Sequence, residues 1–163
     1  MISRFLITFI VVSVTVFLLF PPAELSSAGS VLINEVAWMG TASNAADEWV
    51  ELYNSSASAV DLTGWGLYEA GGDTLILSLS GSIAPNGYYL IERTDDNSIS
   101  DIAADIFGPF AGSGLNNSVE NLVLKDSIGA VVDSVDASSG WPAGDNASKA
   151  SMERKTDGTW QTN

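Results

Sequence analysis

After Gly29 the chain is a succession of short apolar runs, rich in β-branched and aromatic residues, whose apolar positions alternate with polar ones. Clusters of Gly, Asn, Asp, Ser and Pro separate the runs, and no stretch shows the 3.6-residue period of an amphipathic helix. Such spacing is typical of an all-β antiparallel sandwich or barrel. We expect strands near Val31 to Ala37, Glu48 to Tyr53, Trp65 to Glu69, Thr74 to Leu79, Tyr88 to Glu92, Leu122 to Lys125, Val131 to Val135 and Ser151 to Arg154.

Turn-forming residues join several of these runs. Pro85 presets φ for a turn whose later positions, Asn86 and Gly87, tolerate positive φ. Residues 126–129, with the sequence DSIG, are expected to close a hairpin between the last two long runs.

The segment from Thr94 to Ser118 is the least regular part of the chain. It contains two glycine-rich pieces and a short DIFGPF segment. We interpret it as a long surface connection with one helical turn near Ile99 to Ala104.

The densest group of acidic and aromatic residues lies between Asp47 and Trp65. Carboxylates beside aromatic rings are what a glycosidase uses, with two carboxyl groups converging on one substrate. Side chains alternate along a strand, so Val50 and Leu52 are expected to face the core while Glu51 points outward to solvent. Glu48 then lies where the strand begins. The carboxylates are distributed rather than convergent, and we interpret the group as framework.

The first 28 residues differ from the rest. Arg4 precedes an apolar run from Phe5 to Phe20, and small residues at Ser26 to Ala28 suit a signal peptidase. As a helix, sixteen residues would span roughly 24 Å against a hydrocarbon core of about 30 Å. We therefore expect a hydrophobic signal helix over residues 1–28 that is cleaved; the alternative is an uncleaved membrane anchor.

Charge and composition exclude several functions. The chain has 6 basic and 20 acidic residues, a net charge of −14, and loss of Arg4 and Glu24 with the leader leaves that charge unchanged. Few and scattered cations argue against nucleic-acid binding. There is no Cys and no His, so zinc sites built from those residues, cysteine nucleophiles and Ser-His-Asp triads are excluded.

The best candidate for a metal site is the acidic loop in the irregular segment. Hard oxygen ligands suit calcium, but the spacing lacks the glycine and the closing glutamate of an EF-hand, so a solvated loop is the favoured interpretation. No other cofactor is expected. The candidate ligands are Asp95, Asp96, Asn97, Asp101 and Asp105.

Five tryptophans offer a candidate binding surface. Aromatic side chains dominate small sandwich cores, so packing is the favoured role for most of them. Trp141 stands among turn formers in SSGWPAGD and is the candidate for an exposed binding residue. No residue is assigned a catalytic role.

Several motifs, in order and spacing, resemble the lamin-tail domain family in its exported bacterial type. The resemblance runs from Ser30 to Lys155, and its most specific parts are the EWVELYN strand followed by VDLTGW and the hairpin followed by WPAG. It implies an immunoglobulin-like β-sandwich and no inherited catalytic residue. The motifs are VLINEVAW, DEWVELYN, VDLTGWGL, IAPNGYYLIE, LNNSVENLVLKDSIGAVVDSV and WPAGDNASKASMER.

These observations predict a signal peptide over 1–28, a lamin-tail-like domain over 29–158 and a C-terminal tail over 159–163. We expect a non-catalytic, secreted or envelope-bound interaction or adhesion module whose partner is a protein or a cell-surface glycan. It would meet a membrane only through an uncleaved leader. The alternatives are a spacer or targeting domain of a longer surface protein or hydrolase, and a hydrolase that uses carboxylates or a metal.

Overall fold

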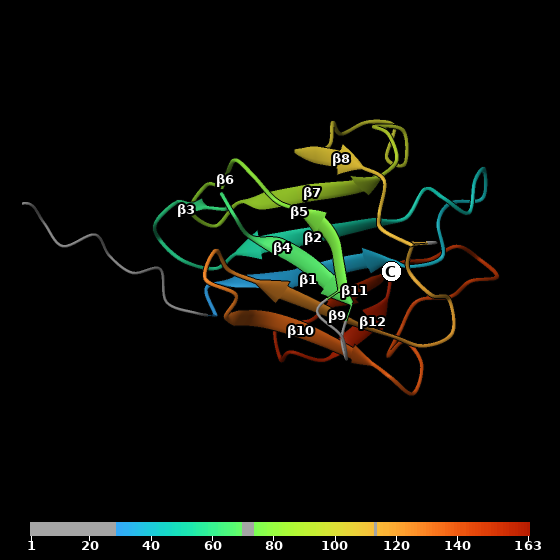
Figure 1. The fold of residues 1–163 in the computed structure, drawn as a ribbon. Coiled ribbons are helices and arrows are strands. Elements are labelled where there is room, and N and C mark those ends of the chain that lie inside the picture. The colour runs from blue at the N-terminus through green and yellow to red at the C-terminus, as the bar shows by residue number, and fades with distance from the viewer. Residues whose placement is uncertain (1–28, 70–73, 113) are drawn as a thin grey trace, which may run out of the picture.

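The computed structural model describes residues 29–69, 74–112 and 114–163. This part of the chain is all-β (Figure 1). The signal helix expected over residues 1–28 lies outside the described residues, and no helix able to cross a bilayer is found within them. The strands are β1 (Val31–Ala37), β2 (Trp49–Asn54), β3 (Val60–Asp61), β4 (Gly66–Glu69), β5 (Thr74–Ser78), β6 (Ser82–Ile83), β7 (Tyr88–Arg93), β8 (Ile106–Gly108), β9 (Glu120–Lys125), β10 (Val131–Ala137), β11 (Met152–Arg154) and β12 (Trp160–Thr162).

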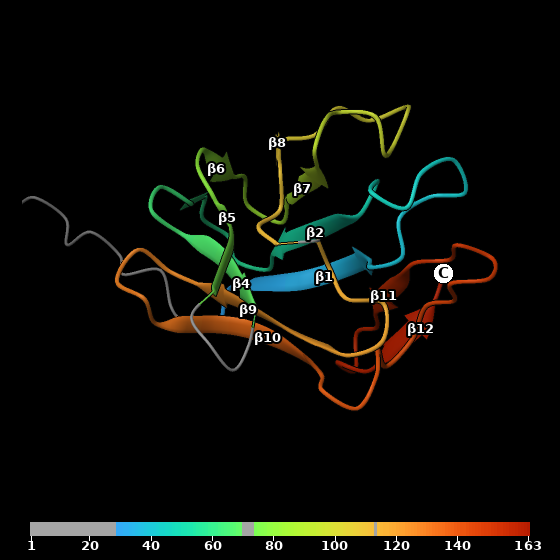
Figure 2. The same ribbon diagram turned by 45° about the vertical axis from the view of Figure 1, so that its right-hand side comes forward.

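Two larger sheets form the layers of a sandwich. One has the strand order β12-β11-β1-β2-β7-β8 and the other β10-β9-β4-β5, while β3 and β6 form a small separate pair. In Figure 1, β4 and β5 lie in front of β1 and β2, and Figure 2 shows β11 and β12 at the opposite end of their sheet from β7 and β8. The arrangement is consistent with an immunoglobulin-like sandwich.

The core lies between the two sheets and follows from the alternation in the sequence. In β2, Val50 and Leu52 have no exposed surface, whereas Trp49, Glu51 and Tyr53 are half-buried on the other side. Buried residues from the facing sheet complete the core; they include Leu67, Leu122 and Leu124. The predicted orientation of Val50 and Leu52 is therefore confirmed.

The long connection from Thr94 to Ser118 contains a strand that the sequence did not indicate. β8 pairs with β7 in parallel, from Ile91 opposite Ile106 onward. The helical turn expected near Ile99 to Ala104 is wrong: the segment consists of turns and bends. Side-chain carboxylates accept hydrogen bonds from backbone N–H groups of this segment. Glu92 accepts from residues 98 and 99, and Asp96 accepts from residue 104.

β12 extends the sheet beyond the expected end of the domain. Residues 159–163 were predicted as a tail, but Trp160 pairs with Arg154 and Thr162 with Met152. The guanidinium of Arg154 also lies over the Trp160 ring, 4.9 Å from its centroid. Cross-strand pairing and this cation–π contact place the segment in the sandwich.

A β-bulge in β1 links the two layers. The register shifts between Ile33 and Glu35, so Asn34 is the extra residue. The N–H of Ile33 donates to Asp133 Oδ2 on β10 at 2.7 Å, and Arg154 Nη2 binds the same oxygen at 2.7 Å. The bulge also places Asn34 and Glu35 next to each other on the outward side of the sheet, where both are half-buried.

Candidate functional site

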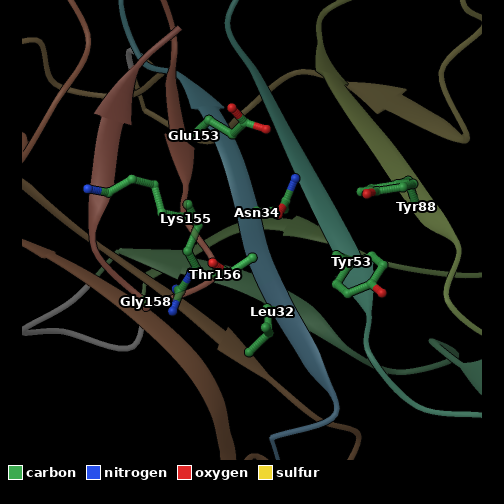
Figure 3. Close-up of a pocket in the computed structure, with 9 residues that line it drawn as sticks. Leu32, Asn34, Tyr53, Tyr88, Glu153, Lys155, Thr156 and Gly158 are labelled. Carbon is green, nitrogen blue, oxygen red and sulfur yellow. The ribbon is translucent and has the colours of Figure 1, made fainter.

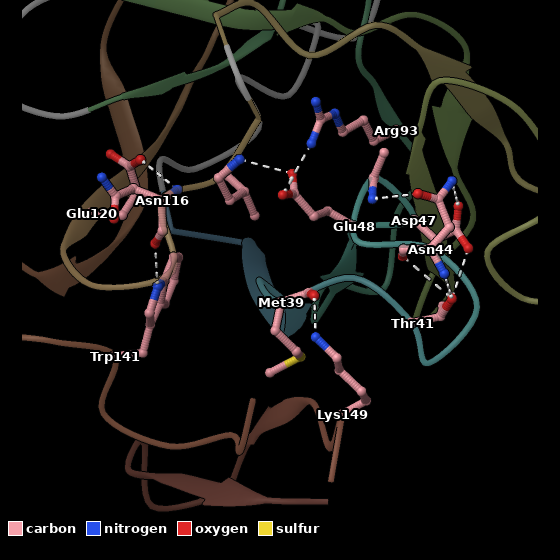
Figure 4. A network of polar contacts seen from close by, with 12 residues as sticks. Met39, Thr41, Asn44, Asp47, Glu48, Arg93, Asn116, Glu120, Trp141 and Lys149 are labelled. Atoms are coloured by element: carbon pink, nitrogen blue, oxygen red, sulfur yellow. Dashed lines mark hydrogen bonds and ion pairs between the residues drawn. The ribbon is translucent and has the colours of Figure 1, made fainter. Parts of the chain in front are cut away.

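Two polar regions flank β2, and the first lies at the loop end of the sandwich, where Glu48 is buried (Figure 4). Its carboxylate forms an ion pair with Arg93 Nη1 at 3.1 Å and accepts the N–H of Leu115 at 2.8 Å. Gly114 leaves room for the pair, since a Cβ there would collide with both charged groups, and its φ of 85° favours glycine. A residue that the sequence placed at the start of a strand is thus a buried, paired anchor.

Opposing influences act on the proton affinity of Glu48. Burial raises the pKa of this carboxyl, the Leu115 N–H and the Arg93 guanidinium lower it, and Glu120 raises it. A polar hollow of about 510 Å³ adjoins the pair and is lined in part by Asn44, Asn116 and Asn117. We call this region, from Glu48 to these asparagines, the loop-end network.

The remaining contacts of the loop-end network hold loops in place. Asp47 accepts hydrogen bonds from the Thr41 hydroxyl at 2.7 Å and from the Asn44 side-chain amide at 2.9 Å. Lys149 Nζ donates to the carbonyl of Met39 at 3.1 Å. Each of these polar groups satisfies a turn or a loop end, which is a structural role.

The second region lies on the outward face of the six-stranded sheet. Leu32, Tyr53 and Tyr88 occupy adjacent positions on β1, β2 and β7, with Leu32 opposite Tyr53 and Tyr53 opposite Tyr88. The two tyrosine rings are 4.9 Å apart between centroids, and Tyr88 is 59% exposed. Figure 3 shows Asn34 between the rings and Glu153, which lies farther across the sheet on β11; all of them line a groove of about 490 Å³. We call this hollow the outward-face groove.

A row of three glutamates crosses the same face of the sheet, and one of them, Glu153, also lines the outward-face groove. Glu35 pairs across the strands with Glu51 on one side and with Glu153 on the other. Glu51 accepts a hydrogen bond from Asn34 at 2.7 Å and Glu153 accepts one from Gln161 at 2.9 Å. Burial raises the pKa of Glu51, the Asn34 bond lowers it, and the neighbouring glutamates raise it further. Like charges opposite one another oppose pairing of the strands.

Glu48 and Glu51 do not converge. Glu48 is buried with Val50 and Leu52, whereas Glu51 lies on the outward side of the sheet. A glycosidase places two carboxyl groups on either side of one scissile bond. The two acids considered as a catalytic pair therefore lie in separate environments, one in the interior and one on the outward face.

The five calcium candidates are not brought together as a metal site. Asp96 accepts the N–H of Ala104, and Asp105 accepts the N–H of Leu90 at 2.8 Å. Over residues 29–69, 74–112 and 114–163 no group of three or more acidic side chains is placed to hold a metal ion. Asp95, Asn97 and Asp101 are exposed on the same loop. Two of the loop's carboxylates, those of Asp96 and Asp105, thus have backbone N–H partners.

Trp141 differs from the exposed residue that its neighbours in the sequence predict. Its ring is half-buried and stacks on Trp38, with centroids 5.8 Å apart and planes 2° from parallel. Its Nε1 donates to the carbonyl of Asn116 at 2.8 Å. One face of the ring and its polar atom are thus engaged by Trp38 and by the backbone of Asn116.

The sequence reasoning did not single out the residues of the outward-face groove. Alternation along β2 places Tyr53 on the same side as Glu51, which was the available signal. It could not show that Tyr88 and Glu153 lie across from these positions, because that depends on strand order and on the bulge at Asn34.

A family model, the Lamin Tail Domain, matches residues 24–139. The chain belongs to the lamin tail domain family, whose members have an immunoglobulin-like fold and are generally non-catalytic. The match ends before β11 and β12, which complete the six-stranded sheet. No curated protein matches the chain.

Proposed function

We propose that this protein is a non-catalytic, exported interaction or adhesion module of the bacterial cell envelope or exterior. The outward-face groove is its binding surface, and its partner is a protein or a cell-surface glycan. A rigid sandwich is well suited to this role because it holds surface groups in fixed positions.

One observation carries the proposal. Tyr53 and Tyr88 form a ring pair on the open side of the sheet, in a groove that also offers the amide of Asn34 and the carboxylate of Glu153. Aromatic surface with convergent polar groups is what both peptides and glycans require. In the loop-end network, Asp47, Glu48 and Lys149 form hydrogen bonds that hold the protein's own loops.

The proposed location has separate support. The apolar run from Phe5 to Phe20 after Arg4, followed by small residues, fits a secretory leader. The net charge of −14 suits solubility outside a cell.

A binding panel tests the proposed function. The purified protein is titrated against defined cell-surface glycans and envelope proteins, and Tyr88→Ala is compared with Phe107→Ala. Phe107 is a matched control because it is also an exposed aromatic residue, 52% exposed, but lies on β8 outside the groove. We expect binding of at least one probe that weakens with Tyr88→Ala only. Inertness toward every probe, or equal losses in both variants, contradicts the proposal.

A further inference from the structure

The aromatic residues of the outward-face groove lie next to a row of glutamates on the same face of the sheet, and Glu153 of that row also lines the groove. Leu32, Tyr53 and Tyr88 form one row across three strands, and the next row along β2 contains Glu51. Tyr53 and Glu51 are two residues apart on the same strand face, which is about 6.7 Å. A four-carbon lysine stem can lie on the Tyr53 ring and bring its ammonium group to the Glu51 carboxylate.

Among the residues that the structure describes, no lysine or arginine forms an ion pair with Glu35, Glu51 or Glu153. Arg93 pairs with Glu48, and Arg154 pairs with Asp133. Two cationic residues line the same groove. Arg154 is paired with Asp133, and Figure 3 shows the side chain of Lys155 extending away from the tyrosine rings.

Bringing three carboxylates into register costs free energy that a bound cation would recover. Adjacent strands are about 4.8 Å apart, so neighbouring glutamates in the row repel one another. The upward influence of Glu35 and Glu153 on the pKa of Glu51 has the same cause. A cation over this row would meet attraction from three sides and from a protein whose net charge is −14.

We propose that the outward-face groove binds an extended peptide segment of a partner protein that carries lysine or arginine side chains. This inference rests on the proposed function and narrows its partner to a basic polypeptide. The tyrosine rings would hold the aliphatic stems and contribute cation–π contacts, and the glutamate row would hold the charged ends.

Charge decides between a basic peptide and an uncharged glycan. Tyrosine rings can stack on either ligand, but a neutral sugar would leave three clustered carboxylates with neutral hydrogen-bond donors and no cation. A bare metal ion is disfavoured as well, because the acids of residues 29–69, 74–112 and 114–163 form no group placed to hold one.

The test uses an eight-residue peptide of alternating lysine and serine, titrated calorimetrically into the purified protein. The groove variant is the double substitution Glu51→Gln with Glu153→Gln. The charge-matched control is Asp95→Asn with Asp101→Asn, which removes two acids from the exposed loop after β7. Thermal melting of each variant verifies the fold.

We expect the groove variant to bind the peptide about tenfold more weakly than the wild type, since two exposed charge contacts together supply about 1.4 kcal/mol. Tyr88→Ala should also weaken binding, whereas the control should change it less than twofold. Binding should fall as salt is added.

Equal losses in the groove variant and in the control would overturn the inference, because they would mean unspecific charge attraction. Absence of peptide binding would overturn it too. If an uncharged glycan then binds in a manner sensitive to Tyr88→Ala, the proposed function stands without its basic partner. If the glycan and protein panel is also inert, both fail.

Discussion

Two glutamates three positions apart, Glu48 just before β2 and Glu51 within it, show how differently the fold can use the same side chain. Glu48 enters the interior, where Arg93 and the Leu115 N–H compensate its charge. Glu51 stays on the open face, where its neighbours across the sheet are two further glutamates and its hydrogen-bond partner is the neutral amide of Asn34. The first is committed to the fold, and the second is available to a ligand.

The difference lies in which partners the fold supplies. A buried carboxylate is tolerated only when it is paired and hydrogen-bonded. A half-buried row of unpaired carboxylates survives because water still reaches it, and any ligand that brings positive charge gains from it. Pairing with a cation, rather than acidity, therefore separates framework from the proposed binding surface in this protein.

The largest expected effect comes from breaking the loop-end pair. Arg93→Leu leaves Glu48 buried without its cation, so the free energy of unfolding should fall by about 3 kcal/mol at neutral pH. Urea unfolding measures the change. Lys155→Met is the control, because Lys155 is exposed, and its substitution should change stability by less than about 0.5 kcal/mol. Equal effects of the two substitutions would deny Glu48 its special status.

A second substitution crowds the same pair without removing a charge. In Gly114→Ala the new methyl group meets Arg93 and Glu48, and the residue keeps a positive φ of 85°. Gly112 shares the left-handed backbone, with φ 70°, but has no atom within 4 Å of an added Cβ. Backbone strain alone should cost Gly112→Ala about 1 kcal/mol, and Gly114→Ala about 2 kcal/mol or more. Similar losses in both variants would show that the pair tolerates displacement.

Substitution of Trp141 is a different way to test whether the loop-end network has a structural role. Trp141→Ala removes the ring stacked on Trp38 and the hydrogen bond to Asn116, and should lower stability by about 2 kcal/mol. Binding of the lysine-serine peptide by the folded variant should be unchanged. If the variant instead has wild-type stability but does not bind the peptide, Trp141 is a binding residue rather than a packing residue.

The smallest effect is a pH dependence that belongs to Glu51. Its pKa in the folded protein is raised above the ordinary 4.5, first by burial and then by Glu35 and Glu153. The folded state therefore binds this proton more tightly than the unfolded chain, and this contribution to stability, full below 4.5, is lost as pH rises through the raised pKa.

Melting temperatures of the wild type and of Glu51→Gln, measured from pH 4 to 7, isolate that contribution. We expect the free energy of unfolding of Glu51→Gln, relative to that of the wild type, to increase as the pH rises, by less than about 1 kcal/mol. A difference between the two proteins that does not change with pH would show that Glu51 is not perturbed by its row.

The alternation of apolar and polar residues was enough to predict the strands that build the core. It could not predict the strands that lack this alternation. β1 runs over the residues that the pattern predicts, Val31 to Ala37, because each inward position is apolar. β3 and β6 have two residues each, too few for a period to be visible. β8 carries Ile106 and Phe107 beside a glycine and is placed by its parallel pairing with β7 rather than by a pattern of its own.

The candidate site depended on information that a linear pattern does not contain. The burial of Glu48 requires Arg93 and Gly114, which are distant in sequence and meet it only in the folded sandwich. The glutamate row requires the bulge at Asn34, which shifts Glu35 to the outward face and into register with Glu51 and Glu153. Local alternation predicts faces, whereas register and long-range contacts decide what meets on them.

The contrast between the outward-face groove and the loop-end network is tested most directly by NMR. Backbone amide chemical shifts are recorded during titration with the lysine-serine peptide. The account predicts that the changes centre on Leu32, Tyr53, Tyr88 and Glu153, the residues of the outward-face groove. Changes centred instead on Asn44, Asn116 and Asn117, at the loop-end network, would contradict it.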